Sequence, residues 1–225
     1  MTRVKICGVT TEADAQLCLD AGADALGFVV EYPLPVPWTI GRARAASLMG
    51  ALPPFAVRVA VVGGDADAIL RIADATEPDA VQLHLDEDEA TVERVKGELA
   101  GTGTRVIKAV RVSADEQGSG ELERWESTCR RFVEAGADTI LLDSKTRGRP
   151  AGTGAVFDWS IARAVAAAID APLVLAGGLT SDNVGRAIAE VRPYAVDVIS
   201  AVEDERHRKV EASVRAFVSA AKAAG

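Results

Sequence analysis

A lysine and a cysteine lie two residues apart near the start of the chain, in the run Val4-Lys5-Ile6-Cys7-Gly8. Side chains alternate between the two faces of a strand, so Lys5 and Cys7 share one face and the apolar residues share the other. An ammonium near a thiol lowers the pKa of the thiol and favours the thiolate, which can remove a proton. The alternative is a small buried core thiol. The strand-end position, the following glycine and the nearby lysine favour a catalytic Cys7.

Two later apolar runs also end in polar side chains. Asp143 closes the run Thr139–Asp143, and a carboxylate there is costly to bury unless it is paired or functional. Its structural alternative is a cap for the following turn. Gln82 and His84 share a face of another run, and His84 reaches its end. The alternative for His84 is a structural hydrogen-bonding histidine. These side chains are candidates for acid–base chemistry and substrate binding.

Glycine-rich segments follow the sixth and seventh apolar runs. They are Gly148–Gly154, which includes Gly154 in the Gly-Thr-Gly triplet, and Ala176–Thr180, which contains Gly177 and Gly178. Bare backbone N–H groups next to a helix N-terminus bind anions. We therefore expect these segments to contribute to a phosphate site.

The elements that position these residues are short β-branched strands alternating with amphipathic helices. The alternation predicts eight strands near residues 3–8, 25–30, 57–62, 80–84, 105–111, 138–143, 172–177 and 196–200. Ala21-Gly22-Ala23 and Ala135-Gly136-Ala137 each predict a helix end that leads directly into a strand. Eight such units favour an α/β fold with one domain over residues 1–225, a (β/α)8 TIM barrel rather than an open doubly wound sheet. Active sites of this fold lie at the carboxyl ends of the strands.

The composition limits the possible partners. The chain has 225 residues, 48% of them hydrophobic, and 25 basic against 33 acidic side chains give a net charge of −8. This charge argues against nonspecific nucleic-acid or anionic-membrane binding and favours a small-molecule partner held locally. The absence of a leader pattern and of a long apolar run predicts a cytoplasmic protein. Three cysteines without metal-ligand spacing predict free thiols and no metal.

Several motifs together resemble the phosphoribosylanthranilate isomerase family, in the order of that family and across essentially the whole chain. They are Lys5-Ile6-Cys7-Gly8, Gly27-Phe28-Val29, Val81-Gln82-Leu83-His84, Leu141-Leu142-Asp143, Gly152-Thr153-Gly154 with Phe157-Asp158-Trp159, and Leu175-Ala176-Gly177-Gly178-Leu179. The opening tetrapeptide and the Gly-Thr-Gly to Phe-Asp-Trp segment are the most specific of these.

The resemblance implies a barrel enzyme of tryptophan biosynthesis that needs no cofactor and converts an N-linked phosphoribosyl aminoaldose to an aminoketose. It assigns Cys7 as general base and Asp143 as general acid, with Lys5 supporting the thiolate. It also implies that Gly177, Gly178, Gly154 and the loop after the eighth strand hold the phosphate of the substrate. Ser200 in that loop can donate one hydrogen bond.

Two segments depart from the family pattern. Where a Ser-Pro-Arg-like segment meets the anthranilate carboxylate in the family, this chain reads Pro35-Val36-Pro37-Trp38-Thr39-Ile40. Trp38 can stack on a flat ring, and Arg42 or Arg44 is a candidate replacement for the missing arginine. In the expected phosphate loop, Ala201 stands where the family has glycine, which narrows the backbone conformations available there.

The sequence therefore predicts a phosphoribosylanthranilate isomerase. A diverged relative that uses the pair Cys7 and Asp143 on another phosphorylated amino-sugar or aromatic substrate is the first alternative. A noncatalytic metabolite-binding barrel is the second, and the presence of both an acid and a base candidate argues against it.

Overall fold

The computed structural model describes residues 1–113, 119–145 and 157–225. Its strands are β1 (Arg3–Ile6), β2 (Ala25–Val30), β3 (Thr39–Ile40), β4 (Val57–Val62), β5 (Ala80–Leu83), β6 (Arg105–Ser113), β7 (Thr139–Lys145), β8 (Leu173–Leu175) and β9 (Ala195–Val198). Its α-helices are α1 (Glu12–Asp20), α2 (Arg42–Gly50), α3 (Ala66–Thr76), α4 (Glu89–Glu98), α5 (Ser119–Glu134), α6 (Trp159–Ala168), α7 (Val184–Val191) and α8 (Glu211–Ala224). A 3-10 helix, η1 (Ser200–Val202), follows β9.

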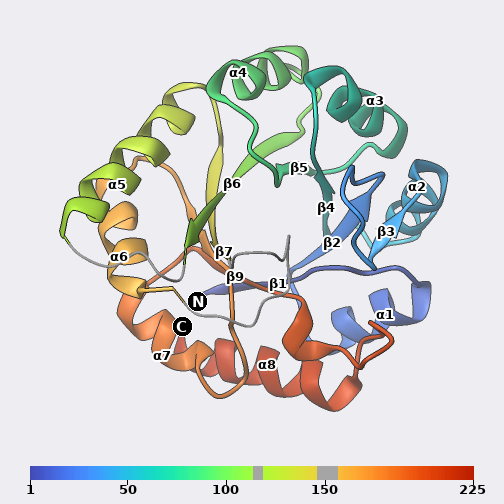
Figure 1. Cartoon of the computed structure of the whole chain (residues 1–225). Helices are drawn as coiled ribbons and strands as arrows, with labels where there is room; N and C mark the ends of the chain where they lie inside the picture. Colours follow the sequence, from blue (N-terminus) through green and yellow to red (C-terminus); the bar gives the residue numbers. More distant parts are fainter. Residues whose placement is uncertain (114–118, 146–156) are drawn as a thin grey trace.

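The strands form a parallel sheet that closes into a ring, with the helices around it (Figure 1). The hydrogen-bonded order is β1-β9-β8-β7-β6-β5-β4-β2, and β1 also pairs with β2. The predicted (β/α)8 barrel is confirmed. One difference is β3, a two-residue strand that pairs with the end of β2 and that the alternation pattern did not predict.

The helix boundaries follow from local sequence. The Thr11 hydroxyl accepts a hydrogen bond from the backbone N–H of Asp14 at 3.1 Å, and the Asp88 carboxylate caps α4 in the same way at 2.9 Å. At the other end of a helix, Gly22 and Gly136 have φ values of 96° and 101°, which favour glycine. The predicted tight returns from helix to strand are therefore present at both glycines.

The buried residues divide into an apolar layer outside the ring and a mixed interior. Val4 and Ile6 of β1 belong to the large core between strands and helices. Lys5, Gln82 and Asp197 are buried as well, although all three are polar. The strands β6 and β7 each extend two residues beyond the predicted ends at 111 and 143. At the carboxyl end of the ring, more polar residues therefore belong to strands than the sequence indicated.

Across the described ranges, the helices are too short or too polar for any of them to cross a membrane.

Candidate active site

A pocket of about 730 Å³, counting its open mouth, lies at the carboxyl end of the ring. Apolar and aromatic side chains form part of its wall, among them Val29, Tyr32 and Trp38. The glycines after β8 form another part, and Cys7 and Asp143 both face the same space. The two candidate catalytic groups therefore meet in one cavity, as their strand-end positions predict.

Cys7 follows β1 and is 7% exposed. Its backbone N–H donates to the carbonyl of Val198 at 2.9 Å, which anchors the residue to β9. Burial raises the pKa of the Cys7 thiol, and the positive charge of Lys5 lowers that pKa but does not outweigh burial. The expectation that Lys5 gives Cys7 a low pKa is therefore corrected: Lys5 limits a rise that desolvation causes.

The lysine is itself paired with an acid that sequence reasoning missed. Lys5 Nζ donates to Asp197 Oδ2 at 2.7 Å, and both side chains are more than nine-tenths buried. Asp197 lines the pocket, and within the described part of the chain its second oxygen has no hydrogen-bond partner. Burial raises the pKa of Asp197 against the effect of Lys5. A carboxylate in the middle of the apolar strand Ala195–Val198 was the available signal, because such a position needs a partner.

Asp143, on β7, is held by His84, which follows β5 and is itself bound by Gln82 of that strand. Asp143 Oδ2 lies 3.3 Å from His84 Nε2, and the amide nitrogen of Gln82 lies 2.8 Å from His84 Nδ1. When the amide donates to Nδ1, the ring proton sits on Nε2 and points to the carboxylate of Asp143. Asp143 Oδ1 also accepts from the backbone N–H of Ser144 at 2.8 Å. Gln82 and His84 thus orient the candidate acid.

The glycine wall follows β8. Gly177 and Gly178 have φ values of 85° and 63°, and a Cβ on Gly177 would lie 2.5 Å from the backbone nitrogen of Ser144. Only glycine fits this close approach. Ser200, in η1, also lines the pocket, whereas the adjacent Ala201 is exposed and is not a lining residue. Gly154, the remaining phosphate candidate, lies outside the described residues.

Trp38 forms part of the apolar wall and is 5% exposed. Its indole N–H donates to Glu203 Oε2 at 2.9 Å, and the buried ammonium of Lys209 lies 3.2 Å from the same oxygen. Gly8, with a φ of 74°, admits the indole, because a Cβ there would lie 2.8 Å from the Trp38 ring. The loop before β3 is therefore attached to the loop after β9.

Arg42, the predicted substitute for the missing arginine, does not reach the pocket. Its Nε and Nη2 donate to the two oxygens of Glu31 at 2.8 and 2.5 Å, and both side chains are partly exposed. Arg44 pairs with Glu12 at the surface. The start of α2 turns both guanidinium groups outward, so neither is placed to bind a ligand in this pocket.

A (β/α)8 barrel with a thiol, a carboxyl group and a glycine wall around one strand-end pocket is typical of an enzyme that acts on a small molecule. The profile of the N-(5'phosphoribosyl)anthranilate (PRA) isomerase family matches residues 4–220. The chain belongs to this family, which confirms the resemblance seen in the sequence.

Curated relatives and solved structures agree with this assignment. An N-(5'-phosphoribosyl)anthranilate isomerase of Haloferax volcanii is 40% identical over 225 residues, covering 100% of this chain and 95% of the relative. The phosphoribosyl anthranilate isomerase structure from Thermotoga maritima has a TM-score of 0.83 and 38% identity, with 99% of this chain and 100% of that chain covered. Another solved isomerase, in complex with reduced 1-(o-carboxyphenylamino)-1-deoxyribulose 5-phosphate, has a TM-score of 0.80 and 35% identity, with coverage of 99% and 100%.

Proposed function

We propose that this chain converts N-(5'-phosphoribosyl)anthranilate to 1-(o-carboxyphenylamino)-1-deoxyribulose 5-phosphate, a step of tryptophan biosynthesis. The observation that carries the proposal is that Cys7 and Asp143 face one pocket from opposite sides of the pair β8 and β9. An acid and a base on either side of one sugar are what an aldose–ketose isomerisation needs.

In the first step, Asp143 is the general acid. It gives its proton to the ring oxygen of the ribose, the bond between that oxygen and C1' breaks, and the nitrogen lone pair forms a C1'=N bond. His84 supports this role, because it holds one oxygen of the carboxyl group while Ser144 holds the other. A fixed carboxyl group delivers its proton in one direction, which is how positioning contributes to catalysis.

In the second step, Cys7 is the general base. Its thiolate removes the proton from C2', and the electron pair moves to form C1'=C2' while the imine nitrogen regains its lone pair. The resulting enolamine tautomerises to the ketone, which completes the isomerisation. Lys5 lowers the pKa of Cys7 against the effect of burial, so it supports the thiolate in this step.

The two ends of the substrate fit the two kinds of wall. The backbone at Gly177 and Gly178, together with Ser200, supports a phosphate, because bare N–H groups and a hydroxyl are donors to phosphate oxygens. The opposite wall, with Tyr32 and Trp38, supports a flat aromatic ring. The sugar then lies between Cys7 and Asp143.

The test is the disappearance of phosphoribosylanthranilate fluorescence with purified protein, the substrate being formed in the cuvette from anthranilate and ribose 5-phosphate. We expect turnover by the wild type and a loss of about a hundred-fold or more in both Cys7→Ser and Asp143→Asn. Cys18→Ser is the matched control, because Cys18 is a buried thiol of α1 outside the pocket. A folded wild type that leaves the substrate unchanged contradicts the proposal.

A further inference from the structure

We infer that Arg111, at the carboxyl end of β6, binds the carboxylate of the aromatic part of the substrate and thereby selects an acidic aglycone. The inference rests on the proposed function, since it is the anthranilate group of that substrate that carries the carboxylate. It assigns a specificity role to a strand residue, where sequence reasoning expected an arginine at the start of α2.

The direction of the Arg111 side chain follows from alternation along β6. Lys108 points outward, where its Nζ lies 5.4 Å from the centre of the Phe132 ring of α5. Ala109 packs inside the ring, so Arg111, two residues further, also points inward. The pairing of β6 with β7 sets Arg111 opposite Asp143. The guanidinium therefore rises from the strand next to that of the candidate acid.

The guanidinium is only partly satisfied. Arg111 Nη2 donates to Asp86 Oδ1 at 2.6 Å, while Nε is buried and has no hydrogen-bond partner among the residues that the structure describes. The Arg111 side chain is 10% exposed, although the carboxylate of Asp86 is 81% exposed. A buried donor without an acceptor is unfavourable, and a carboxylate oxygen of a ligand would satisfy it. The remaining donor thus indicates an anionic ligand.

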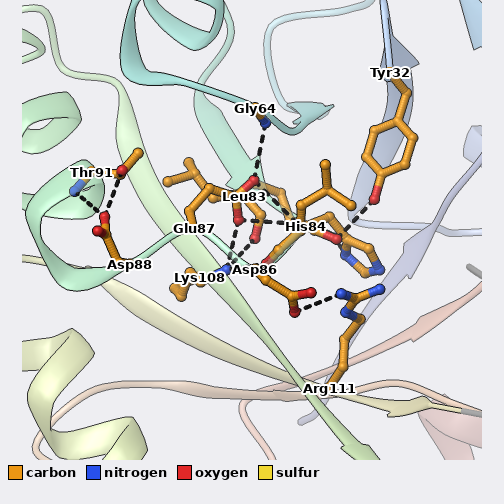
Figure 2. Close-up of polar contacts among 12 residues, drawn as sticks. Tyr32, Gly64, Leu83, His84, Asp86, Glu87, Asp88, Thr91, Lys108 and Arg111 are labelled. Carbon is orange, nitrogen blue, oxygen red and sulfur yellow. Dashed lines mark hydrogen bonds and ion pairs between the residues drawn. The ribbon is translucent and has the colours of Figure 1, made fainter. Parts of the chain in front are cut away.

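The loop that carries Asp86 is firmly held (Figure 2). Lys108 Nζ donates to the carbonyl of Leu85 at 2.6 Å and to Glu87 Oε2 at 2.7 Å, and both charged side chains are 2% exposed. Glu87 in turn accepts from the backbone N–H of Leu85 at 3.0 Å. Because Asp86 lies between these residues, its backbone is held in place, and its carboxylate accepts from Arg111 Nη2.

Arg111 is not itself a lining residue of the pocket, but its guanidinium lies near two residues that are, Tyr32 and His84 (Figure 2). In Figure 2 the Arg111 guanidinium points toward His84, and the Tyr32 hydroxyl lies on the other side of that histidine in this view. The Tyr32 hydroxyl donates to the carbonyl of His84 at 2.8 Å, and both residues line the pocket. The charge of Arg111 lowers the pKa of Tyr32 against the larger effect of burial, which is consistent with their proximity.

The location also fits the chemistry of the substrate. Its ring carries the carboxylate in the position next to the nitrogen, so the carboxylate lies only a few bonds from C1', the atom bonded to the ring oxygen that Asp143 protonates. Arg111 lies opposite Asp143 in the register of β6 and β7, so its cation is suitably placed to bind that carboxylate. The arginines expected from the sequence, Arg42 and Arg44, are each bound to a surface acid instead.

The experiment compares two substrates that differ only in charge. Adducts of ribose 5-phosphate with anthranilate and with 2-aminobenzamide have the same ring and phosphate, but the amide removes the negative charge. Initial rates are measured by chromatography for the wild type, Arg111→Gln and Arg111→Lys. Arg105→Gln is the matched control, because Arg105 lies at the opposite end of β6 and is bound to Asp138.

We expect Arg111→Gln to raise KM for the anthranilate adduct about ten- to a hundred-fold, with kcat changed little. KM for the amide adduct should change less than about three-fold, and Arg111→Lys should give an intermediate loss. In the wild type itself, KM for the anthranilate adduct should be lower than KM for the amide adduct by a similar factor. This comparison tests the inference even if a variant folds poorly.

Equal losses on both adducts, or no loss on either, would overturn the assignment of Arg111 while leaving the proposed function intact. A wild type that turns over neither adduct would overturn the proposed function and this inference with it. Circular dichroism of each variant distinguishes a folded protein with altered KM from an unfolded one.

Discussion

Replacing Lys5 by methionine should make Cys7 a weaker base by raising the pKa of its thiol. A Cβ built on Gly27 would lie 2.8 Å from Cys7 Sγ and 3.0 Å from Lys5 Nζ, so these two atoms are at most about 6 Å apart. At that distance and an effective dielectric constant of about 20, the Coulomb energy is about 3 kcal/mol. At a pH below the pKa, this energy corresponds to about a hundred-fold change in the fraction of Cys7 present as thiolate.

A compensating change at Asp197 reduces that figure. The negative charge of Asp197 raises the pKa of Cys7, and without Lys5 the buried carboxyl group of Asp197 takes up a proton more readily, which removes that charge. We therefore expect the rate of Cys7 alkylation by iodoacetamide at pH 7 to fall about ten- to a hundred-fold. Since the base must be deprotonated, kcat/KM should rise with pH, and Lys5→Met should move that rise to higher pH.

The assay is the pH dependence of alkylation, followed by mass spectrometry at Cys7. The other thiols interfere little, because burial raises the pKa of both Cys18 and Cys129 to about 12. Lys108→Met is the matched control: it also breaks a buried lysine–carboxylate pair with a 2.7 Å contact, but on the outer face of the ring. Each variant should lose about 3–5 kcal/mol of the free energy of unfolding.

Only Lys5→Met should change the alkylation profile of Cys7. The reasoning is refuted if the Cys7 profile of this variant matches that of wild type, or if Lys108→Met shifts the profile by the same amount. The second result would mean that lost stability, rather than lost charge, exposes or protects the thiol.

Three further outcomes follow from the site. Asp143→Asn should lower kcat about 10²- to 10⁴-fold while the thermal unfolding midpoint stays within a few degrees of wild type. Gly177→Ala should cost at least about 2 kcal/mol in urea unfolding and raise KM, because its Cβ would meet the backbone of Ser144 at 2.5 Å; an unchanged KM would contradict the phosphate role. Trp38→Phe should cost about 1–3 kcal/mol in the same measurement, because Glu203 loses the indole donor.

The sequence predicted the strands and the two candidate catalytic groups for a simple physical reason. Apolar β-branched runs alternate with amphipathic segments, and parallel strands place their carboxyl ends at one rim. Cys7 and Asp143 each end such a run, so their meeting in one pocket required only the closure of the ring. The resemblance of their motifs to one isomerase family pointed to the same two residues.

The electrostatic partners could not be predicted in the same way, because they join residues that are distant in sequence. Lys5 and Asp197 are brought together only when β9 pairs with β1, and Trp38 reaches Glu203 across the same closure. The predicted influence of Lys5 on Cys7 therefore had the right sign, but burial and the unpredicted Asp197 opposed it.

Arg111 was missed because the predicted strand ended at that residue, where alternation says little about direction. In the structure β6 continues to Ser113, which makes Arg111 an interior strand residue with a defined face. The family pattern instead places the cation in the segment near Trp38. Local similarity therefore indicates Arg42, whose partner Glu31 holds it at the surface.

The barrel itself explains how a specificity group can change its place in the chain. The strand ends of the ring surround one cavity, so a guanidinium on β6 and one on the loop after β2 can approach the same ligand from different sides. The acid and base have less freedom, because each must reach a particular sugar atom, and Cys7 and Asp143 accordingly match the family motifs. A carboxylate at the edge of a flat ring requires only a donor within reach. Loss of the loop arginine at Trp38 is thus compatible with an unchanged reaction, provided that Arg111 supplies the charge.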